Sequence, residues 1–247
     1  MRPRKKRIRR SSSATKPSTM LRWPIISKTI NESVITAMRL LLLLFVCSVV
    51  ILILINQFVT GLQARDLLVA LQHSNSPTLI SVLQFFTNSI SVVSIGLPVL
   101  ILLISELRKD QSARKKVVIV LVCLGFSGIM SSTVKNMVQK PRPFVIDSRI
   151  EKLSGGGSYS FPSGHTTEAI CAAAIMIFTF RNWYVWFFYL GWALTIMYSR
   201  MALGVHDIFD LIGGIAIGLG STLVVLFVAT RIAAKKDQLA NWSNSWS

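Results

Sequence analysis

The chain alternates between long apolar runs and short polar segments. The run from Leu40 to Phe58 contains no charged residue, and a helix of this length crosses a bilayer at about 1.5 Å per residue. Two further runs predict helices over residues 79–104, with a kink at Pro98, and over 117–138. This pattern is typical of membrane-spanning helices.

Three more apolar runs follow, and they predict helices over residues 165–180, 183–201 and 206–232. The first is short for a membrane span, so we expect its first turn to lie in a polar cavity below the headgroups. The connection over 59–78 is expected to hold a short surface helix. The sequence therefore predicts an all-α fold, a polytopic membrane helical bundle with six transmembrane helices.

Composition agrees with this pattern. Hydrophobic residues make up 52% of the 247 residues and charged residues 15%, and the mean hydropathy is +0.56. The net charge of +17 would suit a nucleic-acid-binding protein, but the cations lie in short blocks between long uncharged runs. We therefore expect a membrane protein with no nucleic-acid partner.

The chain divides into a basic arm over residues 1–38, a six-helix membrane domain over 39–232 and a short tail over 233–247. The arm holds ten of the 27 Lys and Arg residues. We expect it to be disordered and to bind anionic lipid headgroups, with each nearby cation contributing about 1 kcal/mol. Alternatively, the arm serves only as a signal for membrane orientation.

The cations also indicate an orientation, because cytoplasmic loops collect Lys and Arg. The arm, the loop over 106–116 and the tail are rich in both residues, so they are expected to share the cytoplasmic side. Both termini of this multi-pass cell-membrane protein are then cytoplasmic. The polar ends of the last four helices face the extracytoplasmic side.

Three polar segments interrupt the apolar pattern, and this topology brings all of them to the extracytoplasmic face. Ionisable residues at the ends of membrane spans are costly unless they pair or line a cavity, and they mark functional sites. Their composition suits an anionic phosphate group. The segments supply these candidate residues: Lys135, Arg142, Ser163, Gly164, His165, Arg200, His206 and Asp210.

The spacing of these residues predicts a mechanism. His206 and Asp210 are four residues apart on one helix, so the carboxylate orients one ring nitrogen and leaves the other free as a nucleophile. His165 protonates the leaving oxygen and then accepts a proton from water. The groups expected to hold the phosphate oxygens are Lys135, Arg142, Arg200 and the amides near Ser163 and Gly164.

Written as patterns, the segments are Lys135-x6-Arg142-Pro143, Pro162-Ser163-Gly164-His165 and Ser199-Arg200-x5-His206-x3-Asp210. In order and spacing they resemble the signature motifs of the type 2 phosphatidic acid phosphatase family, with no departure at the eleven positions that the motifs specify. The resemblance implies a helical membrane phosphatase that uses no metal or other cofactor. It also implies a phosphohistidine on His206, with His165 as acid and base and Asp210 orienting the nucleophile.

Residues beside the three segments are given supporting or structural roles. Glu168 shares a helix face with His165, which allows either a role near the substrate or a buried acid paired with a cation. Asp207 is expected to cap the last helix. The apolar surroundings of the cysteines predict packing rather than metal binding, and the glycines of the last helix predict close helix packing: Cys47, Cys123, Cys171, Gly213, Gly214, Gly218 and Gly220.

A site at the outer interface meets headgroups laterally from the bilayer, so a lipid phosphate is the expected substrate. The leading prediction is an undecaprenyl diphosphate phosphatase, followed by a phosphatidic acid or phosphatidylglycerophosphate phosphatase. A lipid phosphotransferase is a further alternative. The alternative of another class is an anion transporter or a protein that binds lipid phosphates without hydrolysis. The sequence leaves the oligomeric state open.

Overall fold

The computed structural model describes residues 62–180 and 182–244 of the chain. The basic arm, the predicted helix over 40–58 and Cys47 lie outside the described residues. All regular structure within the described ranges is helical, which agrees with the predicted all-α fold. The elements are α2 (Leu62–Ser74), α3 (Pro77–Asn88), a π-helical turn η1 (Val92–Gly96), α4 (Leu97–Leu107), α5 (Gln111–Val138), α6 (Pro143–Ile146), α7 (Gly164–Thr179), α8 (Trp183–Ala202) and α9 (Ile208–Asn244).

Side-chain caps decide where several helices begin. Asp110 accepts hydrogen bonds at 3.0 Å from the amides of Ser112 and Ala113, so α5 begins at Gln111, earlier than its apolar run predicts. Asn182 caps α8 by accepting a hydrogen bond from the second amide of that helix at 2.9 Å. The short helix α2 is the surface helix expected in the connection over 59–78.

The second predicted span is observed as α3, η1 and α4, which together run from Pro77 to Leu107. Pro98 has no amide hydrogen, and its ring crowds the carbonyl of Ser94 four residues earlier. The π turn over Val92–Gly96 lies at this point and widens the helix. The irregularity predicted at Pro98 therefore takes the form of a π turn.

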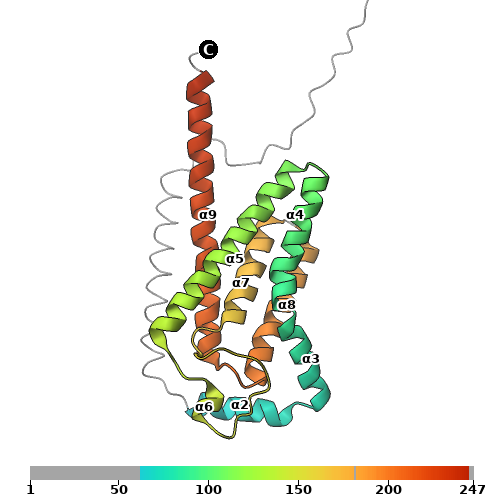
Figure 1. Cartoon of the computed structure of the whole chain (residues 1–247), viewed down its shortest axis with the longest axis vertical. Helices are drawn as coiled ribbons and strands as arrows, with labels where there is room; N and C mark the ends of the chain where they lie inside the picture. The colour runs from blue at the N-terminus through green and yellow to red at the C-terminus, as the bar shows by residue number, and fades with distance from the viewer. Residues whose placement is uncertain (1–61, 181, 245–247) are drawn as a thin grey trace, which may run out of the picture.

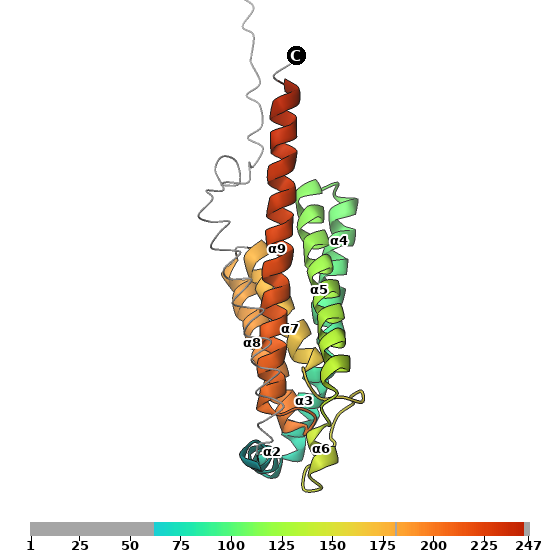
Figure 2. The ribbon, with the colours of Figure 1, turned by 90° about the vertical axis from the view of Figure 1, so that its left-hand side faces the viewer.

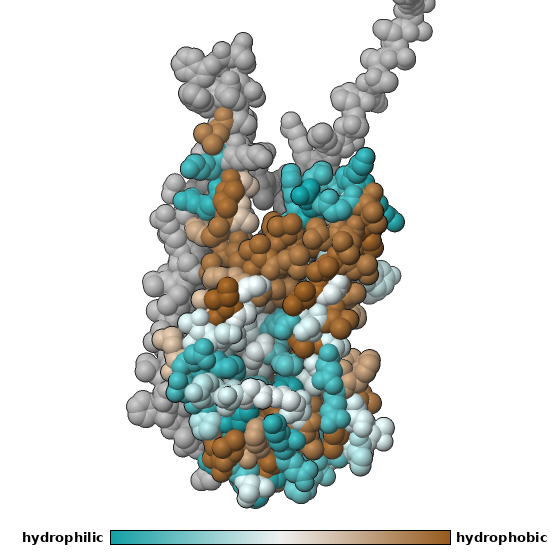
Figure 3. Space-filling view, viewed as in Figure 1, coloured by the Kyte–Doolittle hydropathy of each residue, from teal (hydrophilic) through white to brown (hydrophobic). Residues whose placement is uncertain are grey.

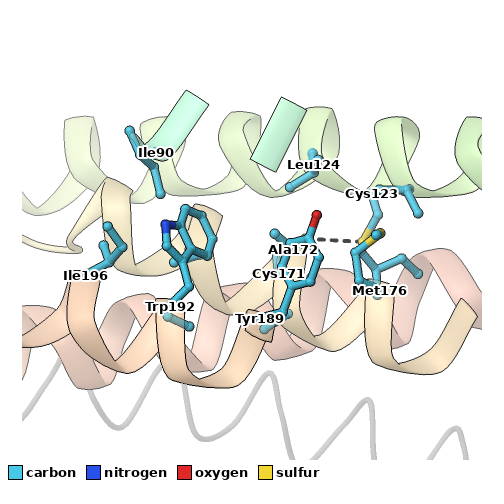
Figure 4. Packing of buried hydrophobic residues seen from close by; sticks show 14 residues of the cluster. Ile90, Cys123, Leu124, Cys171, Ala172, Met176, Tyr189, Trp192 and Ile196 are labelled. Carbon is cyan, nitrogen blue, oxygen red and sulfur yellow. Dashed lines mark hydrogen bonds between the residues drawn. The ribbon is translucent and has the colours of Figure 1, made fainter. Parts of the chain in front are cut away.

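Helix α7 is central in the bundle and packs against α5, α8 and α9 (Figure 1). Its buried side chains are mostly small, so its neighbours approach closely. Figure 4 shows Trp192 and Tyr189 of α8 facing this helix, with the sulfur atoms of Cys123 and Cys171 3.3 Å apart between α5 and α7. Both cysteines are buried and unoxidised, which confirms their predicted packing role.

Glycines bring α9 into close contact with α7. A Cβ atom at Gly218 would lie 2.8 Å from the Thr167 carbonyl oxygen, and one at Gly214 would lie 2.9 Å from the Ser163 carbonyl oxygen. A side chain at either position would push the two backbones apart. The prediction that glycines of the last helix allow close helix packing is confirmed for Gly214 and Gly218.

Three described helical stretches are long and apolar enough to cross a membrane: Pro77–Leu107, Gln111–Ile146 and Ile208–Lys235. Figure 3 shows an apolar band across the molecule, bounded by polar surface at either end. Helix α7 is shorter, at 16 residues, and lies inside the bundle. These features support a polytopic membrane protein, while the count of six spans stays a prediction.

Helix α9 differs from its prediction at both ends. It begins at Ile208 rather than at His206, because the Asp210 amide donates to the Asp207 carboxylate at 3.1 Å and the Asp207 amide donates to the Asp210 carboxylate at 3.0 Å. This reciprocal pair confirms that Asp207 caps the helix. The helix continues to Asn244, through most of the segment predicted as a separate tail, and extends well beyond α4 and α5 (Figure 2).

The helix ends that carry the polar segments meet at one end of the bundle. Helices α5 and α8 end there, α7 and α9 begin there, and α2 and α6 lie beside them (Figure 1). The turn between α4 and α5 lies at the opposite end. The fold therefore places residues distant in sequence in one layer.

Candidate functional site

The polar side chains predicted from the sequence come together in this layer. Lys135 lies in the last turn of α5, Arg142 precedes α6, Ser163 caps α7, Arg200 lies in the last turn of α8 and His206 precedes α9. The core of the site is closed to solvent: the exposed fractions are 4% for Arg142, 1% for Arg200, 2% for His206 and 0% for Asp210.

His206 is oriented by Asp210. Its Nδ1 atom lies 3.3 Å from a carboxylate oxygen of Asp210, and its Nε2 atom faces Arg142 Nη1 at 3.5 Å. The sequence placed both residues on one helix, whereas the structure places His206 in the turn before α9. The pair forms nevertheless, because the capping turn keeps Asp210 one turn away. With Nδ1 held by the carboxylate, Nε2 is the nitrogen available to an electrophile.

Ser160 also contacts this pair, and sequence reasoning missed it. Its hydroxyl donates to the Asp210 carboxylate oxygen that faces His206, and its oxygen lies 3.4 Å from His206 Nδ1. The hydroxyl is fully buried. A serine two residues before Pro162 carries no motif of its own, so only the fold shows its place.

Arg142 reaches across the site from the loop before α6. Its Nε donates to the Gly157 carbonyl oxygen at 2.7 Å, and its Nη1 donates to the Val205 carbonyl oxygen at 3.0 Å. A Cβ atom at Gly156 would lie 2.6 Å from the guanidinium carbon, so this glycine lets the loop close over the arginine. These contacts hold the cation beside His206.

Arg200 is the most deeply placed cation. Its Nη1 donates to the Thr87 and Ser154 hydroxyls at 2.8 and 3.0 Å, and its Nη2 donates to the Gly155 carbonyl oxygen at 3.0 Å. Its Nε is buried and has no acceptor in the part of the chain that the structure describes. A buried guanidinium donor of this kind suits an anionic acceptor.

Lys135 bonds the backbone of the segment before α7. Its ammonium group donates to three carbonyl oxygens, those of Tyr159 at 3.1 Å, Ser160 at 3.3 Å and Pro162 at 2.7 Å. An ammonium group has three hydrogens, so these contacts occupy all of its donors. In this structure Lys135 therefore holds the segment before α7, and its expected contact with the phosphate stays a prediction.

The start of α7 carries the second segment. The Ser163 amide donates to the Asp210 carbonyl oxygen at 3.0 Å, and the Ser163 hydroxyl caps the helix through Thr166. Among the described residues, the amides of Gly164 and His165 have no acceptor, as is usual in a first helical turn. Of the amides expected near Ser163 and Gly164 to contact the anion, these two are the ones without an acceptor among the described residues, and the contact itself stays a prediction.

His165 is partly buried at the mouth of this turn. It lies close enough to Arg200, His206 and Arg142 to interact with their charges. No hydrogen bond joins its ring to another described residue. Within the described part of the chain, the imidazole therefore interacts with the charge of His206 and has no hydrogen-bonding partner.

Lys140 is the second residue that sequence reasoning missed. Its Nζ atom lies 2.6 Å from the Asp207 carboxylate and 3.0 Å from the Asp210 carboxylate. The sequence does show a third cation between Lys135 and Arg142, but the motif of that segment does not specify a cation at position 140.

Among the described residues, Glu168 forms no ion pair with a cation. Its carboxylate instead accepts a hydrogen bond from the buried Ser94 hydroxyl, on the side of α7 that contacts η1. Within residues 62–180 and 182–244, no group of three or more His, Cys, Asp or Glu side chains is arranged to hold a metal ion.

The family model described as the PAP2 superfamily matches residues 116–233. Undecaprenyl-diphosphatase BcrC of Bacillus subtilis is 30% identical over 158 residues, which cover 60% of this chain and 74% of that protein.

Two lipid A 4'-phosphatases match shorter segments. The Porphyromonas gingivalis protein is 51% identical over 65 residues, and the Bacteroides thetaiotaomicron protein is 34% identical over 80 residues. The matched segments cover 27% and 36% of these relatives, so the chain aligns with only about a third of their length or less.

Two solved structures share the fold. A transmembrane PAP2 type phosphatidylglycerolphosphate phosphatase from Bacillus subtilis has a TM-score of 0.63 at 22% identity, covering 77% of this chain and 96% of that chain. Aquifex aeolicus LpxE has a TM-score of 0.54 at 22% identity, covering 65% of this chain and 93% of that chain.

Proposed function

The chain belongs to the PAP2 superfamily, and from this premise we propose that it is an integral membrane lipid phosphatase. It hydrolyses a phosphomonoester or diphosphate headgroup through a phosphohistidine on His206. One observation carries the proposal: the buried guanidinium groups of Arg142 and Arg200 lie in one layer with His206, and Arg200 Nε is a buried donor without an acceptor among the described residues. A phosphoryl group satisfies that donor and places its phosphorus before the imidazole.

The first half-reaction transfers the phosphoryl group to His206. Nε2 attacks the terminal phosphorus atom, and a P–N bond forms as the P–O bond to the leaving group breaks, which is the lipid alcohol of a phosphomonoester or the lipid monophosphate of a diphosphate. His165, protonated at this stage, gives its proton to the departing oxygen. Arg142, Arg200 and the first amides of α7 stabilise the charge on the non-bridging oxygens.

The second half-reaction releases phosphate. Neutral His165 takes a proton from water, the water oxygen bonds to phosphorus, and the P–N electron pair returns to His206. Asp210 keeps the His206 ring oriented in both steps. Lys135 supports the reaction by holding the 159–162 segment.

A lipid substrate is supported by the position of the site, where the apolar band meets the polar end of the bundle (Figure 3). Undecaprenyl diphosphate is the leading substrate, because a relative that this chain matches over 74% of its length is an undecaprenyl-diphosphatase. Lipid A, phosphatidylglycerophosphate and phosphatidic acid are the alternatives. The site faces the extracytoplasmic side in the proposed orientation, with both termini in the cytoplasm.

The test is phosphate release by the purified protein in detergent, with these four lipids and without added divalent metal. We expect His206→Ala to lower kcat by about 10³-fold or more. His73→Ala, on the exposed surface of α2, is the matched control and keeps full activity. Full activity of His206→Ala would reject the nucleophile, and phosphate uptake into vesicles without hydrolysis would favour a transporter.

A further inference from the structure

A lysine outside the family motifs holds the carboxylate that orients His206. Lys140 Nζ lies between the carboxylates of Asp207 and Asp210, at 2.6 and 3.0 Å. The exposed side-chain fractions are 15% for Lys140, 13% for Asp207 and 0% for Asp210. The three charges therefore interact with little screening by solvent.

The first turn of α9 holds the two carboxylates close to each other. Asp207 and Asp210 cap α9 reciprocally, each accepting a hydrogen bond from the backbone amide of the other. Two buried carboxylates this close tend to share a proton unless a cation offsets their repulsion. Burial and the charge of Asp210 raise the pKa of Asp207, while Lys140 opposes both effects.

Protonation of Asp210 would disable the nucleophile. One Asp210 oxygen accepts from Lys140, and the other faces Ser160, the Asp207 amide and His206 Nδ1. A neutral carboxyl would stabilise the imidazolium less and no longer fix the ring tautomer. The other cations that act on Asp210 are Lys135 and Arg142, and neither contacts its carboxylate.

We propose that Lys140 is a positioning residue that keeps Asp210 ionised in the presence of Asp207, so that His206 remains an oriented nucleophile. The inference rests on the proposed phosphohistidine mechanism and adds a role that the motif residues do not supply. Lys140 acts through Asp210, because two of its three donors are directed at the carboxylates and its side chain is mostly buried.

The experiment measures kcat and KM against pH for Lys140→Met with the preferred lipid. We expect kcat to fall by about tenfold or more with KM nearly unchanged, since the substrate contacts stay in place. The acid limb of the kcat profile moves to higher pH by about one unit, because the lost cation no longer favours the ionised carboxylate.

The sharper test removes the competing carboxylate. In Lys140→Met/Asp207→Asn we expect most of the lost kcat to return and the acid limb to move back, because Asn still caps α9 while its charge is gone. Lys140→Arg keeps the cation and retains activity. Lys152→Met is the matched control and behaves as wild type, because Lys152 is an exposed lysine over the Phe144 ring in the loop between α6 and α7.

Two results would overturn this inference and leave the proposed function standing. A raised KM with unchanged kcat in Lys140→Met would make Lys140 a substrate contact. The second result is a Lys140→Met/Asp207→Asn variant that is folded, as judged by its melting temperature in detergent, but has not regained the lost kcat. It would show that Lys140 does not act by offsetting the charge of Asp207. A wild-type protein without phosphatase activity, or a fully active His206→Ala, would overturn the proposed function and this inference with it.

Discussion

Arg142 and Arg200 both lie beside His206, but they are held in different ways. Arg142 is fixed by carbonyl groups of the 155–157 loop and of Val205, whereas Arg200 is fixed by two hydroxyls and by Gly155. A planar guanidinium presents several donors in a fixed geometry, which an ammonium group does not reproduce. The residue type, and not only the charge, matters at both positions.

Arg200→Lys tests this requirement. We expect kcat/KM to fall by about 100-fold, because one ammonium nitrogen cannot occupy both the Nη1 position, which bonds the Thr87 and Ser154 hydroxyls, and the Nε position proposed for the phosphate. Arg149→Lys is the matched control, since Arg149 is an exposed arginine paired with Asp66 and Asp147. Equal losses in the two variants would contradict a specific role for Arg200.

Gly156 tests the placement of Arg142. In Gly156→Ala the new methyl group would lie 2.6 Å from the guanidinium carbon, so the arginine or the loop must move. We expect kcat/KM to fall by about tenfold or more, since displacements near 1 Å are costly in active sites. Gly155→Ala, where no heavy atom lies within 4 Å of the new Cβ, should remain active. Similar activity of both variants would argue against a fixed Arg142.

At the scale of elements, the contact between α7 and α9 sets the distance between His165 and His206. Helix α7 carries the first histidine in its first turn, and α9 begins directly after the second. Glycines on α9 face the α7 backbone, so the spacing of the two helices depends on the absence of side chains there.

Gly218→Ala should weaken this contact. The added Cβ lies 2.8 Å from the Thr167 carbonyl oxygen and 3.0 Å from the Cys171 amide nitrogen, and backbone atoms cannot rotate away. We expect a loss of stability of about 1–3 kcal/mol, measured as a lower melting temperature in detergent. Gly125→Ala on α5, which meets no atom within 4 Å, serves as the control. A melting temperature equal to that of the control would contradict the packing argument.

The sequence predicted the helices well because their apolar runs are long and several ends carry Pro, Asn or Asp. It placed the start of α9 two residues too early, since it treated Asp207 and Asp210 separately and not as a reciprocal cap. It could not show that the Lys135 ammonium group bonds the backbone before α7, because a charge pattern does not reveal which carbonyl oxygens lie within its reach. Lys140 and Ser160 were missed because their partners lie about 50 to 70 residues away.

At the scale of the whole molecule, the apolar band separates the site from the α4–α5 turn (Figure 3). The proposed orientation places the site outside the cell and the turn inside. Single engineered cysteines test this orientation, in a chain whose own cysteines are replaced by alanine. Ser158 is exposed in the loop between α6 and α7, and we expect Ser158→Cys to react with an impermeant maleimide in intact cells.

Ser112→Cys, exposed at the start of α5 on the opposite end, should react only after lysis. The two positions thus serve as controls for each other. Labelling of Ser112→Cys in intact cells, with Ser158→Cys protected, would reverse the orientation and place the site in the cytoplasm.

The central claim is that His206 carries the phosphoryl group between lipid and water. Its most direct test is rapid acid-free quenching of the protein during turnover of a phosphate-labelled lipid, followed by mass spectrometry of its peptides. We expect a base-stable, acid-labile phosphoryl group on His206 that disappears as phosphate is released and is absent from His206→Ala. Turnover with no phosphorylated peptide in the quenched wild-type protein, or with the label on His165 instead, would contradict it.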